Sequence, residues 1–444
     1  MILRDKMLAL MADVNAQVAE REELVELIAI ALLTRKNLFI LGDPGQAKSY
    51  AINAFRCRIN GARQFERLLS KQTDEEQLFG RIDLSSLIPG SVSIDVLDKN
   101  PHYQEMCGKL KTRLANGQSP DDWPDKIEQY RKALAILYGG EPTVNTTGKI
   151  PEAEICFLDE CFKANDGVLN SLLTALNERK YTNEGRTYHI PTISFFAASN
   201  EIPNFSDPQE KILQALYDRL ELKFVTANIV EKANRQRVLK DKQAGRHGQI
   251  AATITLEELE RMQEEVSAIP VPDGINDLAD DVLCELRKSI RVSDRKFLGY
   301  YPIAQAKAWL EGHKTVEPSD LLALVSYFWE KPSDIPLVLT TLTRMCLDPI
   351  KDKANDIRAT AGEVMEEFEN AVANGVDDKK ALRKFREEML RVYGMYTDLE
   401  RKTQADSEKA ITNALLEDLE KDNRKTSEQV GFTYIPLAEL ATMK

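Results

Sequence analysis

The chain has few of the residues that indicate metal centres, disulfide frameworks or membrane spans. Its 444 residues include only four histidines and six cysteines, and no two cysteines have the C-x-x-C spacing of a zinc or redox motif. We therefore expect reduced thiols and a cytoplasmic protein. No apolar run approaches the roughly 20 residues that a membrane span needs. Asp5 and Asp13 interrupt the apolar residues of the N-terminus, so we expect neither a membrane span nor a signal peptide.

Basic charge is also in short supply. The 59 lysines and arginines face 71 aspartates and glutamates, which gives a net charge of −12. Because non-specific nucleic-acid binding depends on basic surfaces, we expect no nucleic-acid partner. The length allows two or three domains of about 100–200 residues each, and a hydrophobic content of 43% is ample for their cores.

The most informative segment present is NLFILGDPGQAKS, residues 37–49. A short apolar run leads into a glycine- and proline-rich turn that ends in Lys48 and Ser49, which is typical of a phosphate-binding loop between a strand and a helix. Lys48 would reach the β- and γ-phosphates of ATP, and the Ser49 hydroxyl would ligate Mg²⁺. The alternative is a plain turn before a lysine, because Ala47 replaces the second glycine of the common motif. We predict that the nucleotide contacts Gly42, Asp43, Pro44, Gly45, Gln46, Ala47, Lys48, Ser49 and Tyr50.

A second group of candidate residues follows two later apolar runs. The run at 155–158 ends at Asp159 and Glu160, and the run at 192–197 is followed by Asn200. Ligands of open α/β sheets bind at the carboxyl ends of the strands. ATP hydrolysis needs a metal ligand and a group that polarises the attacking water. We assign Asp159 to Mg²⁺ and Glu160 to the water, and Asn200 would hold the water or a phosphate oxygen; a turn-forming asparagine is the alternative.

Two arginines complete the candidate site. Arg219, in ALYDRLEL, is either an arginine finger or an ordinary cation at a helix end. Arg295, in RVSDRKF, stands at an expected helix start, where the helix dipole disfavours positive charge. Binding to the γ-phosphate of ATP would explain a positive charge at this position.

Strands and helices alternate through residue 225, which predicts an α/β fold with a parallel sheet covered on both faces. Residues 90–148 are polar and rich in Pro and Gly, and we interpret them as an insert with one amphipathic helix, 125–137. We predict three domains: a nucleotide-binding core at 1–225, an all-helical lid at 226–345 and a helical extension at 346–444. In the extension, apolar residues at helical spacing indicate a helical hairpin or short coiled coil, either an interaction arm or ordinary packed helices; they are Val364, Phe368, Leu382, Phe385, Met389, Val392 and Tyr396.

Taken together, these motifs resemble those of the AAA+ ATPases, within them the MoxR branch, and most of all the RavA type. The resemblance covers residues 15–350, and the segments that carry it are GDPGQAKS (42–49), PEAEICFLDE (151–160), LNSLLTALNER (169–179), AASNEIP (197–203), ALYDRLEL (215–222) and VSDRKF (292–297). Members of this family commonly have Ala before the loop lysine. The insert is longer than in typical members, and the region after 350 resembles no family domain.

The resemblance implies a role for each candidate residue. Lys48 and Ser49 would belong to Walker A, Asp159 and Glu160 to Walker B, and Asn200 would be sensor 1. Arg295 would be sensor 2 on the lid, and Arg21 lies where the family contacts adenine. Arg219 would be a finger that acts on the neighbouring subunit.

A finger supplied in trans implies a homo-oligomer, usually a ring of six subunits. The family also implies a separate partner with a von Willebrand factor A domain, which the ring would remodel or chaperone with ATP and Mg²⁺. Two alternatives stay open. One is an ATP-gated binding platform with slow hydrolysis, and the other is a nucleic-acid motor, which the acidic net charge disfavours.

Overall fold

The computed structural model describes residues 2–43, 46, 48–83, 88, 91–138, 144–183, 186–205, 210–245, 250–347, 349–402 and 406–442. The chain divides into two compact units, and each unit contains three segments that are separated in the sequence. The first contains Met1–Val271, Leu298–Val316 and Ser326–Pro332, and the second contains Pro272–Phe297, Glu317–Val325 and Ser333–Lys444. The domain limits at 225 and 345 therefore stay predictions.

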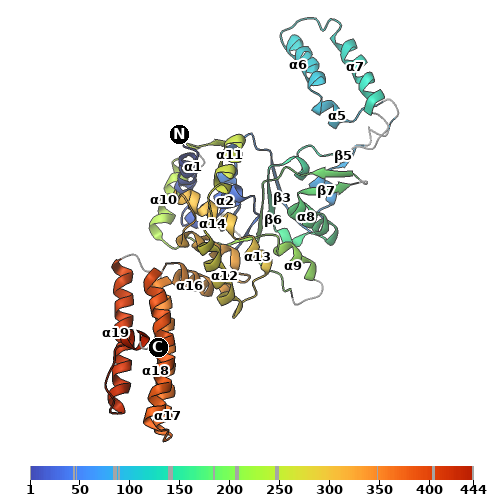
Figure 1. Cartoon of the computed structure of the whole chain (residues 1–444). Helices are drawn as coiled ribbons and strands as arrows, with labels where there is room; N and C mark the ends of the chain where they lie inside the picture. Colours follow the sequence, from blue (N-terminus) through green and yellow to red (C-terminus); the bar gives the residue numbers. More distant parts are fainter. Residues whose placement is uncertain are drawn as a thin grey trace. The chain divides into compact units, whose positions relative to one another are not determined.

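A five-stranded parallel sheet forms the centre of the first unit (Figure 1). Its strand order is β10-β1-β9-β6-β3, and every neighbouring pair is parallel. The strands are β1 (Leu38–Leu41), β3 (Gln64–Leu68), β6 (Ile155–Asp159), β9 (Ser194–Ser199) and β10 (Leu222–Val225). Strands β1, β6 and β9 contain the apolar runs that precede Gly42, Asp159 and Asn200 in the sequence.

Helices cover both faces of this sheet, because its central strands are apolar on both sides. Helices α2 (Glu22–Thr34) and α3 (Lys48–Arg56) contact its strands and each other. On the opposite face, alternate strand residues such as Phe39, Cys156 and Phe195 share a buried cluster with α8 (Asp166–Glu178) and α9 (Lys211–Tyr217). The expected α/β fold with a two-sided parallel sheet is confirmed.

Further elements complete the first unit. Strands β7 and β8 pair antiparallel. The helices are α1 (Leu3–Gln17), α4 (Glu75–Phe79), α10 (Lys232–Gln243), α11 (Leu256–Ser267) and α14 (Tyr301–Glu311). The short elements are β2 (Ile59–Asn60), β4 (Arg81–Ile82), β5 (Val144–Asn145), η2 (Ile150–Glu152), η3 (Cys161–Lys163), β7 (Lys180–Asn183), β8 (Arg186–His189) and β11 (Ile254–Thr255).

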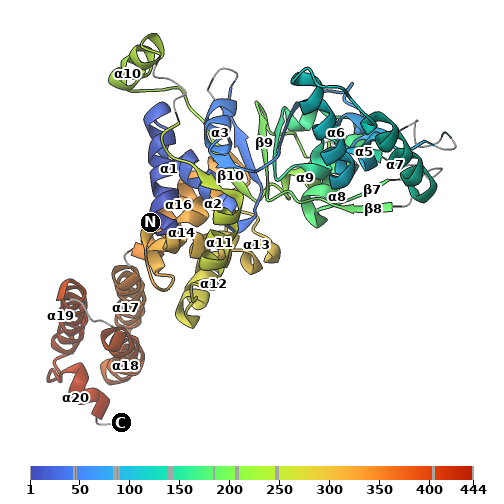
Figure 2. The ribbon, with the colours of Figure 1, turned by 90° about the horizontal axis from the view of Figure 1, so that it is seen from above.

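The insert contains more helix than the sequence analysis expected. Besides α7 (Trp123–Tyr138), it forms α5 (Ile94–Lys99) and α6 (Pro101–Ala115), and α6 and α7 pack side by side (Figures 1 and 2). The expectation of a single helix is therefore wrong. Only Met106 of α6 is buried, so its sequence lacks the wide apolar stripe that reveals a packed helix.

The second unit is helical among its described residues. Its elements are α12 (Asp273–Arg287), η4 (Pro318–Leu324), α16 (Ile335–Leu347), α17 (Pro349–Ala373), α18 (Asp378–Lys402), α19 (Asp406–Gln429) and α20 (Leu437–Thr442). Three elements run across the sequence limits of the units: α13 (Asp294–Leu298), α15 (Val325–Phe328) and η5 (Pro332–Asp334). None of the described helices combines the length and the apolar composition needed to cross a membrane.

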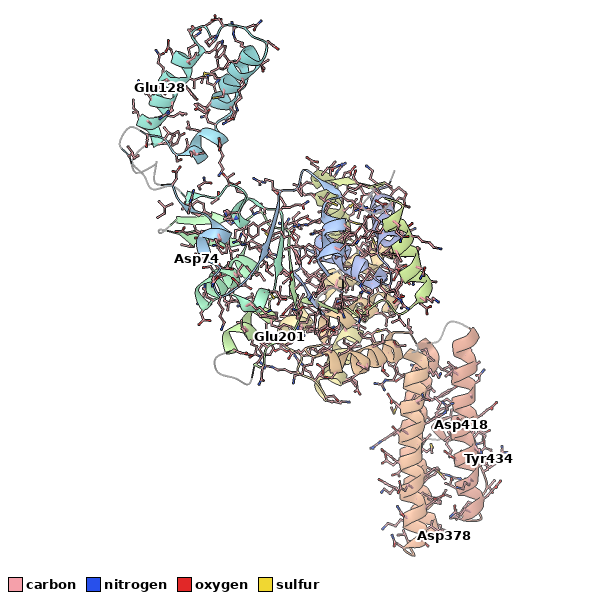
Figure 3. All side chains as sticks on the ribbon, turned by 180° about the vertical axis from the view of Figure 1, so that it is seen from behind. Asp74, Glu128, Glu201, Asp378, Asp418 and Tyr434 are labelled. Atoms are coloured by element: carbon pink, nitrogen blue, oxygen red, sulfur yellow. The ribbon has the colours of Figure 1, made fainter. Side chains whose placement is uncertain are left out.

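Three long helices, α17 to α19, pack together near the C-terminus with α20 against α18 (Figure 3). All seven apolar residues noted in the sequence pack in their shared core, with Val364 only partly buried. The expected hairpin is therefore a three-helix bundle, because Leu415 and Leu419 of α19 close the same core.

Candidate nucleotide-binding site

Three adjacent strands end at the same edge of the sheet. Strand β9 pairs with β1 on one side and with β6 on the other, all in parallel. Their carboxyl ends lead directly into Gly42, Asn200 and Glu160. Glu201, labelled in Figure 3, marks this end of β9. The structure thus brings together three segments that are far apart in the sequence.

Lys48 lies at the centre of this edge. Its Nζ donates hydrogen bonds to the carbonyl of Gly42, to the carbonyl of Ser199 at 3.2 Å and to Oδ1 of Asn200 at 2.6 Å. Burial lowers the pKa of Lys48, and the carboxylate of Asp159 opposes that shift. A buried ammonium group among carbonyl oxygens is well placed to attract phosphate.

Glu160 continues the hydrogen-bond chain that begins at Lys48. Its Oε1 accepts from Nδ2 of Asn200 at 2.5 Å, and its Oε2 lies 3.0 Å from Nζ of Lys163. The backbone of Glu160 has φ +53°, in the left-handed region. Such conformations cost about 1–3 kcal/mol and cluster at functional sites. The side chain therefore has a hydrogen bond at Oε1 and an ion pair at Oε2.

Asp159 and Ser49 supply oxygen atoms at the same edge. Oδ1 of Asp159 accepts from the backbone N–H of Glu160 at 3.0 Å. Burial raises the pKa of Asp159, although this hydrogen bond opposes the rise. A half-buried carboxylate and a hydroxyl are the hard oxygen donors that Mg²⁺ prefers, so these two residues fit the metal role predicted for them.

The loop after β1 leaves no room for a side chain at its first position. A Cβ added to Gly42 would lie 1.8 Å from Oγ1 of Thr226 and 2.5 Å from Oε1 of Gln46. That Oε1 accepts from Oγ1 of Thr226 at 2.6 Å and from the N–H of Asp43 at 3.1 Å. Gln46 therefore fastens the loop to the end of β10. The other predicted loop residues, Pro44, Gly45 and Ala47, lie outside the described residues.

Comparison with protein-family models identifies the family of this chain. A model of the MoxR domain in MoxR-vWA-beta-propeller ternary systems matches residues 5–104 and 132–264, and a model of an AAA lid domain matches 273–342. The chain belongs to the MoxR family of AAA+ ATPases. The residues left unmatched at 105–131 lie in the insert of this MoxR-family chain.

Related proteins cover most of the chain. Two uncharacterised proteins of Methanocaldococcus jannaschii are each 29% identical, one over 79% of this chain and 78% of its own length, the other over 72% and 71%. A crystal structure of a candidate ATPase from Cytophaga hutchinsonii superposes with a TM-score of 0.54 at 14% identity, covering 77% of this chain and 94% of that one. At that identity the similarity shows the fold alone.

In this MoxR-family chain, Arg21 lies under the nucleotide loop. Its Nη2 donates to the carbonyls of Gln46, at 3.4 Å, and Ala227, and its Nη1 donates to the carbonyl of Glu20 at 2.7 Å. Burial lowers the pKa of this guanidinium. Tyr50, on α3, donates to Oε1 of Gln17 at 3.2 Å. Arg21 thus links the loop to the end of β10, and its contact with adenine stays a prediction.

The two predicted sensor and finger arginines lie on different compact units. Arg219 follows α9 in the first unit, and its Nη1 donates to the carbonyl of Ala215 at 2.7 Å. Its buried Nε makes no hydrogen bond to any described residue. Arg295 lies on α13 in the second unit and is exposed. The functional roles of both stay predictions.

Two residues of the site were missed by the sequence analysis. Lys163 stands three residues after Glu160, a spacing that pairs side chains across one helical turn. Thr226 follows the last residue of β10, and its Oγ1 also donates to the carbonyl of Leu41 at 3.2 Å. The positions of both next to strand ends were the signals available.

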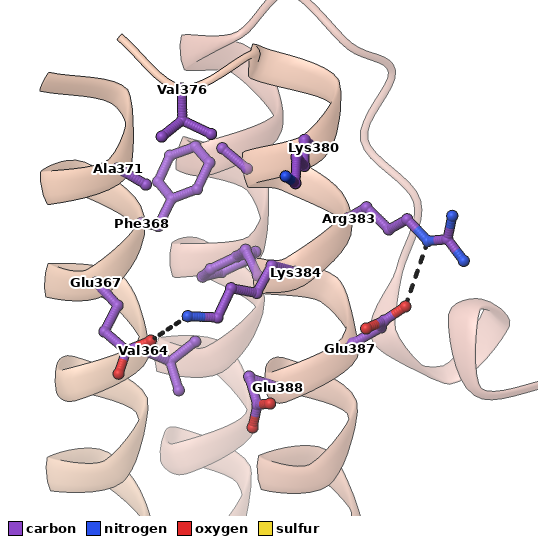
Figure 4. A pocket seen from close by; sticks show the side chains of 12 residues that line it. Val364, Glu367, Phe368, Ala371, Val376, Lys380, Arg383, Lys384, Glu387 and Glu388 are labelled. Atoms are coloured by element: carbon purple, nitrogen blue, oxygen red, sulfur yellow. Dashed lines mark hydrogen bonds and ion pairs between the residues drawn. The ribbon is translucent and has the colours of Figure 1, made fainter. Parts of the chain in front are cut away.

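A hollow lies in the C-terminal bundle between α17 and α18 (Figure 4). It measures about 640 Å³ and has an apolar floor that includes Phe368 and Phe385. Charges at its rim are matched, since Lys384 pairs with Glu367 and Arg383 with Glu387. It shows none of the acid–amide–lysine chemistry of the nucleotide site.

Proposed function

We propose that this MoxR-family protein hydrolyses ATP with Mg²⁺. The observation that carries the proposal is the continuous chain from Lys48 through Asn200 to Glu160, with contacts of 2.6 and 2.5 Å. It joins a phosphate-binding cation to a carboxylate base through one amide. These are the groups that phosphoryl transfer to water requires.

Each residue has a defined task in this proposal. The phosphates of ATP replace the carbonyl oxygens around Lys48, and Ser49 and Asp159 hold Mg²⁺. The metal, when bound, neutralises charge on the phosphate oxygens. Glu160 accepts a proton from the water that attacks the γ-phosphorus, the bond to the β–γ bridging oxygen breaks, and ADP and phosphate leave. Asn200 orients the water and Glu160 relative to each other.

We further propose that the protein works as a ring, of six subunits by family resemblance. Arg219 would stabilise the transition-state charge at the neighbouring subunit's ATP, and Arg295 would contact the γ-phosphate of its own subunit. The buried Nε of Arg219, which has no hydrogen-bond partner among the described residues, supports a ligand outside the subunit. The RavA type stays the most specific form of this proposal.

The partner that we propose is a separate protein with a von Willebrand factor A domain, which the ring remodels or chaperones. Its support is the description of the matching family model, which names MoxR-vWA-beta-propeller ternary systems. We place the protein in the cytoplasm because all six cysteines are free thiols. The alternative is a binding platform with slow hydrolysis, and the experiment described next distinguishes the two functions.

The test is the substitution Glu160→Gln. We expect turnover to fall by about 10²–10⁴, the usual contribution of a general base, while ATP still binds because Lys48, Ser49 and Asp159 remain. Steady-state phosphate release and binding of a fluorescent ATP analogue measure the two effects. The matched control is Glu201→Gln, an exposed carboxylate two residues after Ser199, which should keep wild-type turnover.

Near-wild-type hydrolysis by the Glu160→Gln protein would refute the assignment of the base. Hydrolysis that is barely measurable in the wild-type protein, with strong binding of a partner only in ATP, would favour the platform.

A further inference from the structure

The two carboxylate oxygens of Glu160 have unequal partners. Oε1 makes a hydrogen bond of 2.5 Å with Asn200, whose own Oδ1 is fixed by Lys48. Oε2 is buried and makes no hydrogen bond with any described residue. Its neighbour is the ammonium of Lys163 at 3.0 Å, an ion pair without hydrogen-bond alignment. Oε2 is therefore the oxygen left to take a proton from water.

The turn after β6 brings Lys163 back toward Glu160. Cys161–Lys163 form a single 3-10 turn, and the N–H of Lys163 donates to the carbonyl of Glu160 at 2.9 Å. This hydrogen bond closes the turn, with Glu160 at its start and Lys163 at its end. Cys161 and Phe162 are buried and anchor the turn, so the backbone of Lys163 stays in place when its side chain moves.

The side chain of Lys163 is free to leave. It is 52% exposed, whereas that of Glu160 is 14% exposed. Ion pairs with an exposed partner are screened by water and contribute little. Lys163 is thus a weak restraint placed against the reactive oxygen.

We propose that Lys163 is a positioning residue that holds Glu160 back from the attacking water until its ammonium group leaves Oε2. The inference rests on the proposed function, in which Glu160 is the base. While the ion pair is closed, the ammonium occupies the approach to Oε2. When it opens, Oε2 faces the water, and Asn200 keeps the carboxylate aligned.

The experiment is Lys163→Met in the full-length protein, which keeps the apolar stem and removes the charge. We expect kcat for ATP to rise by up to about fivefold, the factor that an exposed ion pair supplies, with KM for ATP unchanged. Lys163→Arg restores a cation and should return kcat to the wild-type value. Lys180→Met is the matched control, because Lys180 is similarly exposed and pairs with Glu178 at 3.9 Å.

Several outcomes would overturn the proposal. A kcat that stays the same or falls in Lys163→Met would show that Lys163 restrains nothing or assists the reaction. An equal rise in Lys163→Arg or Lys180→Met would show that the charge at this position is not the cause. Thermal melting verifies that each variant folds.

A double variant separates this idea from the proposed function. Adding Glu160→Gln to Lys163→Met should remove the gain in kcat. If Glu160→Gln alone leaves turnover intact, the assignment of the base fails; if Glu160→Gln is inactive and Lys163→Met shows no gain, only the restraint fails.

Discussion

Burial acts on two charged residues of the candidate site, Lys48 and Asp159. It disfavours the charged form of any group, so it lowers the pKa of Lys48 and raises the pKa of Asp159. The proposed function nevertheless requires both charges, one for phosphate and one for Mg²⁺. The isolated subunit therefore carries an electrostatic cost at this edge of the sheet, and Mg²⁺ with ATP would relieve it.

The substitution Asp159→Asn tests this cost. A carboxyl with a raised pKa in the folded state binds its proton more tightly there, so its contribution to stability falls as the pH rises through that range. At pH 7 in EDTA we expect the Asp159→Asn protein to have a higher melting temperature than the wild type, and no ATP turnover. The difference should shrink as the pH falls toward 3.8, the ordinary pKa of the group.

Calorimetric melting at several pH values measures the effect. A melting temperature at pH 7 below that of the wild type would show that the Asp159 carboxylate stabilises the subunit instead. Asp218→Asn, at an exposed position, is the control and should show little change.

The sequence predicted which side chains gather at the site, but not everything they touch. Lys48, Asp159 and Asn200 follow apolar runs, so the geometry of a parallel sheet places them at one edge. Their contacts depend on side-chain conformations that no pattern reveals. Lys163 therefore escaped notice, and the roles of the predicted residues still await experiment.

At the scale of elements, helices and strands were predicted correctly where the apolar pattern of the sequence was strong. The buried run of β6 was recognised within one residue of its observed end. Helix α6 was missed, because its polar sequence packs mainly against α7. In the bundle, the apolar periodicity of the sequence correctly predicted α17 and α18. It did not predict that α19 packs against both of them, because an apolar helix face does not reveal how many helices cover it.

A core substitution in this bundle provides the element-scale prediction. Phe385 is buried on α18, with its ring centroid 5.3 Å from that of Phe368 on α17. Phe385→Ala should cost about 3–5 kcal/mol of bundle stability, whereas ATP binding should persist because the nucleotide site lies in the first unit. Helical circular dichroism during urea unfolding, together with ATP binding, measures both.

Met395→Ala is the control, because Met395 on the same helix is 46% exposed. Loss of ATP binding in the Phe385→Ala protein at temperatures where the bundle has unfolded would show that the two units depend on each other.

At the scale of the whole molecule, the residues proposed as phosphate-binding cation, metal ligands and base all lie in the first compact unit. The proposed finger is the exception, because Arg219 would act only when a second copy is present. Activity should therefore depend on assembly as well as on the site itself.

Mixing two inactive variants tests this dependence. Arg219→Ala should lower turnover by about 10³–10⁵, the usual contribution of an arginine finger, and Lys48→Ala should abolish ATP binding. In mixed assemblies the Lys48→Ala subunit still supplies Arg219 to its neighbour, so we expect partial recovery of phosphate release. Mixing Lys48→Ala with the double variant Lys48→Ala/Arg219→Ala should recover nothing.

No recovery in mixtures that native mass spectrometry shows to be co-assembled would exclude a finger that acts between subunits.

The turn that joins α6 to α7, residues 116–122, is exposed along its whole length and falls in the stretch that the family model does not match. A photo-crosslinking amino acid placed there by codon expansion would report neighbours of the insert inside living cells. Maleimide labelling is the poorer route, because Cys57 and Cys284 are already exposed thiols. An affinity tag could be inserted in the same turn, because every residue assigned to ATP binding lies far from it in the sequence.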